Sequence, residues 1–372
     1  MKKIYIIILA IVLHICICCL IILKKKSSIN FKSKVSQKII DKYRNNFDII
    51  VTWVDYSNKK YNEETKKAGG SSMNVKGEFK ELKYLIRSLL KHNIEFRNIY
   101  IVHSDNHPPP KYLVKNNPRL FFVPHSKIVK NKSDLPLIHR ESITINLHRI
   151  PGLLNNYFYF EDDMFIHHPN IIYKQLEFYE NKKQIVFTIR KPNKKLTNPE
   201  ITSGLWRLGW VNSNKIFDKF KKDNIIFWED HNIWFYNKKI VEEIENKYEK
   251  YFTNTSSYQD IKKCKKKEKY YVSIQNVYNN YLIHKLNFEP IKNQDLVNSV
   301  HSNSKKYEVK GNKITKNTIP KLLKDMNNYK YHMFSNLQGP GISDEYTKIP
   351  KINKIFFKWL NKLYKNKTEF EI

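Results

Sequence analysis

The strongest constraint on the fold is an alternation of short apolar runs with helical patterns in the first half of the chain. Phe47 to Val54 is compact, apolar and rich in β-branched residues, which is typical of a buried strand. A polar loop from Asp55 to Gly77 follows it. Between Leu82 and Leu90, leucine and isoleucine then recur at three- and four-residue spacing, which predicts an amphipathic helix.

The alternation continues to a strand that ends in carboxylates. Ile99 to Val102 and Leu120 to Val123 predict two more strands, and Glu141 to His148 predicts a helix. The apolar run Tyr157 to Phe160 then ends in Glu161, Asp162 and Asp163. Strands that alternate with helices predict an α/β fold, here a Rossmann-like, mostly parallel sheet flanked by helices. Open sheets of this kind place ligands at the carboxyl ends of their strands.

The second half of the chain has a weaker pattern. Helices are predicted near Lys215 to Lys221, Lys239 to Tyr251 and Val272 to Leu286. With 372 residues, of which 41% are hydrophobic and 14% aromatic, the chain is able to bury a sizeable core. We therefore expect one large domain over residues 47–372.

An apolar segment precedes this domain. Ile4 to Leu23 is almost entirely apolar, with lysines on both sides, and about 20 such residues cross a bilayer core. We expect residues 1–26 to be an uncleaved signal anchor, with a cleaved signal peptide as the alternative, and residues 27–46 to be a stem. This predicts a single-pass membrane protein of type II, in the Golgi or endoplasmic reticulum if eukaryotic, although the flanking lysines alone do not fix the orientation.

The formal net charge of +32 would suit a polyanionic partner. The lysines are spread along the whole chain and form no clear basic stripe or nucleic-acid motif. We interpret the charge as solvated surface and expect no nucleic-acid partner.

The carboxylates after the predicted strands suit a divalent cation. Mg²⁺ binds through one or two carboxylates together with phosphate oxygens of the substrate, so Asp162 and Asp163 are candidate metal ligands. A solvated acidic turn or a helix cap accounts for the same residues equally well. Asp55 follows the first strand in the same way, whereas Trp53 fits either a donor contact or ordinary core.

At this point the sequence resembles the Stealth family of sugar-phosphate transferases. Asp48 to Asp55, DIIVTWVD, is similar to the first conserved segment of that family, and the pieces of the second segment follow in order. Leu205 to Phe220 and Asp230 to Ile244 resemble the third. The stretch from Thr255 to Tyr281, in the place of the fourth, contains lysines and no arginine. The second-segment pieces are Glu81 to His92, Arg97 to Val102, Asn116 to Leu120, Val123 to Ile128, Asn131 to Pro136 and Leu147 to Phe165.

The resemblance implies phosphoryl transfer. Such an enzyme moves a sugar-1-phosphate, here expected to be an N-acetylhexosamine-1-phosphate from a UDP-GlcNAc-type donor, to a hydroxyl of an acceptor glycan or glycoprotein, and releases a nucleoside monophosphate. It implies a divalent cation, Mg²⁺ or Mn²⁺, to bridge the diphosphate. The residues that it assigns are His231 as general base, Arg207 and Asp163 as catalytic, Asp162 and Asp163 as metal ligands, and Trp53, Asp55, Arg87, Asn131, Ser133 and Arg149 as donor-binding.

Several of these residues also fit roles that involve no substrate. Without the family resemblance, His231 would be interpreted as a packed or capping histidine, and Arg207 also fits a surface ion pair. Asn131 and Ser133 also form a glycosylation sequon. Two other functions remain open: a metal-dependent glycosyltransferase of related α/β fold, and a non-catalytic basic membrane protein that binds polyanions through its lysines.

Overall fold

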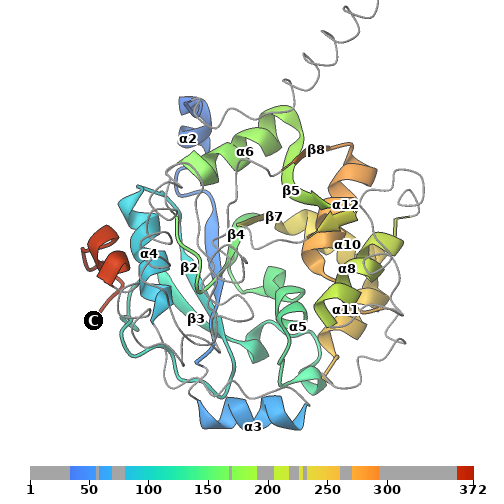
Figure 1. The fold of residues 1–372 in the computed structure, drawn as a ribbon, viewed down its shortest axis with the longest axis horizontal. Helices are drawn as coiled ribbons and strands as arrows, with labels where there is room; N and C mark the ends of the chain where they lie inside the picture. Colours follow the sequence, from blue (N-terminus) through green and yellow to red (C-terminus); the bar gives the residue numbers. More distant parts are fainter. Residues whose placement is uncertain are drawn as a thin grey trace, which may run out of the picture.

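The computed structural model describes residues 34–55, 58–68, 80–166, 170–190, 205–217, 226–228, 233–259, 270–292 and 358–372. Its centre is a five-stranded sheet of order β3-β2-β1-β4-β7 (Figure 1). The strands are β1 (Asp48–Thr52), β2 (Ile99–His103), β3 (Leu120–Pro124), β4 (Asn156–Glu161) and β7 (Trp234–Asn237). The first four are mutually parallel, which confirms the predicted mostly parallel α/β sheet.

The centre of the sheet is apolar on both faces. Ile49, Ile50 and Val51 of β1 are completely buried, as expected for a parallel strand covered on both sides. Helix α4 (Glu81–Lys91) packs its apolar stripe on this core, and its Leu85 and Leu89 are completely buried. The three strand predictions before β4 and the α4 prediction are therefore confirmed.

The edge strand β7 was not predicted. It runs antiparallel to β4, and aromatic rings face one another across the pair. The rings of Tyr157 and Tyr236 stack at 5.3 Å between centroids, and those of Tyr159 and Trp234 at 5.0 Å. Cross-strand aromatic pairs of this kind stabilise a sheet edge.

Several helices differ from the sequence-based predictions. The loop expected from Asp55 to Gly77 contains α3 (Lys59–Lys67), and the predicted helix at Glu141 to His148 is a short α5 (Arg140–Thr144) followed by the turn η3 (Leu147–Arg149). The helix predicted from Lys215 to Lys221 is misplaced, because α8 (Leu205–Lys215) ends where it was expected to begin. The other two helix predictions are confirmed. The one from Lys239 to Tyr251 spans α10 (Lys238–Lys247) and the start of α11 (Glu249–Ser256). The one from Val272 to Leu286 is α12 (Ile274–Leu286).

The segment expected as a stem contributes to the core. Residues 37–43 form α2 (Gln37–Tyr43), which packs against the unpredicted helix α6 (Asn170–Lys182). Tyr43 is 1% exposed, and its hydroxyl donates to Glu180 Oε1 at 2.6 Å. Lys42 pairs with the same carboxylate. The described part of the proposed stem is thus folded against the domain.

A second, smaller sheet of order β6-β5-β8 lies beside the main one. It consists of β5 (Gln184–Arg190), β6 (Ile226–Trp228) and β8 (Glu289–Lys292). Helices α8 and α12 pack together next to it, with Asn280 Nδ2 donating to Asn214 Oδ1 at 3.1 Å. In Figure 1 these helices, with α10 and α11, lie on the opposite side of the main sheet from α4.

The predicted transmembrane helix and single-pass membrane localisation require correction. Within the described ranges, no helix is long and apolar enough to cross a membrane. The longest there, α6 and α12, have 13 residues each. At a rise of 1.5 Å per residue they extend about 20 Å, short of the roughly 30 Å of a bilayer core. The predicted anchor, Ile4 to Leu23, lies outside these ranges, and neither membrane anchoring nor a Golgi location is proposed further.

Candidate functional site

The candidate site lies where the carboxyl ends of β1 and β4 meet. In the sheet register Thr52 lies opposite Glu161, and Thr52 Oγ1 is 3.1 Å from the hydroxyl of Tyr159. Strand β1 has β2 on one side and β4 on the other, so the strand order reverses here. Such a reversal is the usual position for a ligand in an open parallel sheet.

Three of the predicted carboxylates follow these two strand ends. Asp55 comes three residues after β1, and Asp162 and Asp163 directly follow β4. Asp163 is 2% exposed, whereas Asp55 and Asp162 are partly exposed. The shared edge of the sheet therefore brings together residues that are more than 100 positions apart in the sequence.

An arginine that the sequence analysis missed lies at the same place. Arg140, the first residue of α5, pairs its Nε with Glu161 Oε1 at 3.3 Å. Its guanidinium carbon also lies 5.4 Å from the centre of the Trp234 ring. Burial disfavours the charge, but the nearby carboxylates of Glu161 and Glu141 outweigh burial and raise the pKa of Arg140. A permanent cation therefore lies at the end of β4, where it is able to attract phosphate oxygens.

Helix α3 covers this end of the sheet. Figure 1 shows α2, which precedes β1, beyond one end of the sheet and α3, which follows β1, beyond the other. Tyr61 of α3 has its ring 5.0 Å from that of His107. The pKa of Tyr61 is raised, mainly by burial and also by the negative charge of Asp162. Tyr61 is thus a further candidate site residue. The sequence analysis missed it because the segment that forms α3 has no apolar periodicity and was predicted to be a loop.

Buried histidines lie behind α3. His103, His107 and His125 are all buried, and burial is the largest cause of the lowered pKa of each. The pKa of His107 falls to about 4 although Asp55 opposes the shift, and that of His125 falls to about 3. Neither ring nitrogen of His107 has a hydrogen-bond partner. These side chains are therefore neutral around pH 7.

We expect stability to fall as the pH drops below about 6.5, the ordinary pKa of an unfolded histidine, because the unfolded chain then binds protons that folded His107 does not. Between about pH 7 and pH 5, His107 alone should cost about 2 kcal/mol. Thermal unfolding followed by circular dichroism at both pH values measures this loss. In His107→Phe the loss should shrink; equal pH dependence in the variant and the parent would contradict the assignment.

Two predicted donor-binding arginines have structural partners instead. Arg87 donates from Nε and Nη2 to the two carboxylate oxygens of Glu371, at 2.8 and 2.6 Å. Arg149 contacts the side chains of Asn146 and Glu245. Both guanidinium groups are thus held by partners within the protein, and their contact with a donor phosphate stays a prediction.

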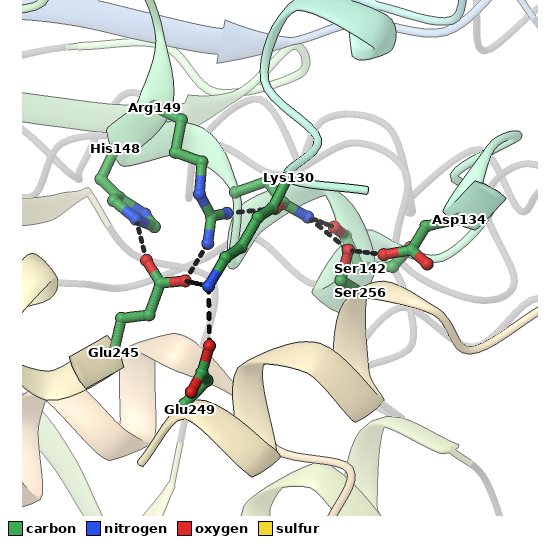
Figure 2. A network of polar contacts seen from close by, with 9 residues as sticks. Lys130, Asp134, Ser142, His148, Arg149, Glu245, Glu249 and Ser256 are labelled. Atoms are coloured by element: carbon green, nitrogen blue, oxygen red, sulfur yellow. Dashed lines mark hydrogen bonds and ion pairs between the residues drawn. The ribbon is translucent and has the colours of Figure 1, made fainter. Parts of the chain in front are cut away.

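Arg149 belongs to a polar network that holds η3 against α10 and α11 (Figure 2). Glu245 accepts from His148 Nε2 at 2.8 Å as well as from Arg149. Glu249, the first residue of the neighbouring helix α11, pairs with Lys130 at 2.8 Å. A second branch runs from Asn146 Nδ2 to Ser256 Oγ, which donates to Asp134 Oδ2 at 2.7 Å. The network fixes the segment on either side of α5, and with it Arg140.

Of the other predicted site residues, the structure describes the side chains of Trp53, Asn131 and Ser133. Trp53 is 4% exposed and packs edge-on against His107, so it is a core residue with no free face for a base. Asn131 and Ser133 are exposed, and Asn131 Oδ1 caps the turn η2 (Lys132–Asp134) by accepting from Ser133 N at 3.2 Å. Arg207 lies on α8, but its side chain is outside the described part of the structure, as is the whole of His231. The approach of His231 to Asp163 therefore stays a prediction.

The described residues contain no group of three or more histidines, cysteines and carboxylates arranged to hold a metal ion. Glu161 is paired with Arg140, and the carboxylates of Asp162 and Asp163 directly follow it at the end of β4. One or two carboxylates completed by substrate phosphate oxygens are what Mg²⁺ typically uses. The donor set thus fits a cation that binds together with a phosphorylated substrate.

Comparisons with known proteins find phosphotransferases among the similar sequences. Exopolysaccharide phosphotransferase of Streptomyces coelicolor is 33% identical over 129 residues, 33% of this chain and 24% of that protein. Capsular polysaccharide phosphotransferase SacB of Neisseria meningitidis serogroup A is 29% identical over 239 residues, which is 62% of this chain and 42% of that protein. This chain thus spans less than half the length of these two relatives.

Among solved structures, 4-diphosphocytidyl-2C-methyl-D-erythritol synthase of Anaerococcus prevotii is similar at 12% identity, over 69% of this chain and 90% of that chain. With a TM-score of 0.34, this likeness carries no argument about fold or function. The family profile described as Stealth protein CR2, conserved region 2, matches residues 76–187, a range that contains α4, α5, β4 and the carboxylates after β4. Over this conserved region the chain is similar to Stealth proteins, and its relatives are named as phosphotransferases.

Proposed function

We propose that the protein transfers a sugar-1-phosphate from a nucleotide sugar to a hydroxyl of an acceptor glycan and releases a nucleoside monophosphate. The observation that carries this proposal is the edge of the sheet where Asp162 and Asp163 follow β4, beside the end of β1 and next to Arg140. These residues lie within the matched conserved region. The names of the relatives, capsular and exopolysaccharide phosphotransferases, support the same reaction class.

In this proposal the diphosphate of the donor lies across the carboxyl ends of β1 and β4. Asp162 and Asp163 would hold Mg²⁺ or Mn²⁺, which when bound neutralises charge on the diphosphate oxygens. Arg140 adds a fixed positive charge at the end of β4, where it is paired with Glu161. Asp55 lines the same edge from β1. Phosphoryl transfer depends mainly on positioning and charge stabilisation of this kind.

The remaining roles come from the family resemblance. His231 is proposed as the base that accepts the proton of the acceptor hydroxyl, because imidazole titrates near neutral pH. Arg207 is proposed to contact the transferred phosphate. The donor is proposed to be of UDP-GlcNAc type, carrying an N-acetylhexosamine-1-phosphate.

A donor labelled in its β-phosphate tests the reaction class. After incubation with UDP-N-acetylglucosamine and a glycan acceptor, we expect the label in the glycan product and UMP in solution. Release of UDP with an unlabelled product would instead indicate a glycosyltransferase, in which the acceptor attacks the sugar carbon. If a panel of nucleotide sugars gives neither product, the proposal of a non-catalytic protein gains support.

Substitution of the carboxylates tests the site. Asp163→Asn and Asp162→Asn should each lower kcat/KM about 100-fold, because each removes a negative ligand from the diphosphate site. Asp41→Asn is the matched control, since Asp41 lies on α2 with its side chain 55% exposed. It should leave kcat/KM unchanged. Wild-type activity in both site variants, with folding verified by circular dichroism, would disprove the assignment.

A further inference from the structure

Buried polar atoms without partners occur on α5 and in the first turn of α12, and a hydrogen bond from Tyr271, just before α12, to Glu141 of α5 connects the two elements. Asn276 is 1% exposed, and neither Oδ1 nor Nδ2 has a hydrogen-bond partner. Gln275 is equally buried, and its Nε2 has no partner. Glu141 is 4% exposed, and its Oε1 has none. Buried polar groups without partners are costly, so their presence in one region points to a ligand.

In two of these side chains, one polar atom accepts a hydrogen bond and the other has no partner. Tyr271 donates its hydroxyl to Glu141 Oε2 at 2.9 Å, which leaves Oε1 without a partner. Ser273 Oγ donates to Gln275 Oε1 at 3.0 Å, which leaves Nε2. The segment from Tyr271 to Asn276 thus connects α5 to the first turn of α12. Its contacts fix the carboxylate and the amide before any ligand binds, which reduces the entropy lost on binding.

The chemistry of the free atoms selects the kind of ligand. Glu141 Oε1 and Asn276 Oδ1 accept hydrogen bonds, whereas Gln275 Nε2 and Asn276 Nδ2 donate them. A phosphate would need donors only, and the carboxylate of Glu141 would repel it. A hydroxyl group both donates and accepts, so several hydroxyls on one ring satisfy this mixed set.

The position of the group relates it to the proposed diphosphate site. Glu141 directly follows Arg140, whose guanidinium pairs with Glu161 at the end of β4. We propose that Glu141, Gln275 and Asn276 form the subsite for the hydroxyl groups of the sugar that the nucleotide donor carries. This inference rests on the proposed function and assigns its sugar specificity to residues of α5 and α12.

Asn276→Leu is the sharpest test, because leucine has the same branching and no polar atoms. Asn276→Ala removes the amide without added volume. In the ligand-free protein both variants should keep or raise Tm, because an unpartnered buried amide is lost. Asn280→Leu is the matched control on the same helix, where the amide donates to Asn214 Oδ1 and Asn276 O. That variant should lower Tm.

Binding is measured by titration calorimetry with UDP-N-acetylglucosamine, UDP-N-acetylgalactosamine and GDP-mannose, each against its own nucleoside diphosphate. For the nucleotide sugar that supports transfer, both Asn276 variants should weaken binding about 10-fold or more, which corresponds to about 1.4 kcal/mol. Affinity for the free nucleoside diphosphate should change less than twofold.

The outcomes separate this inference from the proposed function. Transfer by the parent protein with unchanged sugar affinity in both Asn276 variants would overturn the subsite and leave the function standing. A drop in Tm like that of Asn280→Leu, with sugar and nucleotide weakened together, would make Asn276 structural and also overturn it. Absence of transfer and binding across the panel would instead reject the proposed function.

Discussion

Replacement of Arg87 by methionine is expected to lower the free energy of unfolding by about 3–5 kcal/mol, the usual cost of leaving one partner of a buried ion pair alone. The side chains of Arg87 and Glu371 are 11% and 5% exposed, and the pair is bidentate. Arg87 Nη1 also donates to the carbonyl of Tyr364 at 3.0 Å. Methionine retains most of the apolar stem but leaves the carboxylate of Glu371 buried without its cation.

The effect should be large because this pair ties the end of the chain to α4. Phe370 is completely buried, and the hydroxyl of Tyr364 donates to the carbonyl of Ile166 at 2.9 Å. The pair also raises the pKa of Arg87, mainly through the hydrogen bond to Glu371. Loss of the arginine should therefore loosen residues 358–372 together.

Urea denaturation followed by tryptophan fluorescence measures the change. Arg44→Met is the matched control, since Arg44 is 51% exposed and pairs with Glu95 and Asp41 on the surface. Exposed pairs contribute about 0–1 kcal/mol, so this variant should stay within that range. If the two variants lost the same free energy of unfolding, the conclusion that the buried pair of Arg87 and Glu371 stabilises the fold would be wrong.

The parallel core of the fold was predictable because its strands are short, apolar and bounded by polar residues. Ile49 to Val51 are buried on both faces of the sheet, and a run of that composition has few alternatives. The elements that were missed depend on contacts distant in sequence. Helix α2 is short and gains its stability from packing on α6, more than 120 residues later. Local propensity contains little of that information.

The candidate site was predictable only where an apolar strand ended in carboxylates. Asp162 and Asp163 were predicted as site residues because they follow an apolar strand and open sheets bind ligands at such ends, and the structure places them directly after β4. Arg140 was missed because its role depends on an ion pair with Glu161, 21 positions later, and its helix has only five residues. The partners of Arg87 and Arg149 were missed for the same reason, since an arginine that binds phosphate and one that binds a distant carboxylate look alike in a sequence.

Asp48 has a structural role within a segment that resembles a conserved segment of the Stealth family. It opens the segment that ends at Asp55, but it lies at the amino end of β1, away from the candidate site, and is completely buried. Its Oδ1 accepts from Arg97 Nε at 3.0 Å and Asn98 N at 3.2 Å. Its Oδ2 accepts from Arg97 Nη2 at 2.6 Å and Leu154 N at 2.8 Å. One carboxylate thus joins β1 to the start of β2 and to the turn before β4.

Asp48→Asn is expected to cost about 3 kcal/mol or more, although it preserves the size of the side chain, because hydrogen bonds to a buried charge contribute about 1.5–3 kcal/mol and a buried donor is left facing another donor. Whichever way the amide turns, its Nδ2 meets an N–H group of Arg97 and a backbone N–H. Arg97→Met should cost less, since Asp48 would keep both backbone donors and the Arg97 side chain is 36% exposed. Urea denaturation of the two variants beside Asp41→Asn ranks the costs. If Asp48→Asn proved as mild as the exposed Asp41→Asn, the carboxylate would not be what holds the three strands in register.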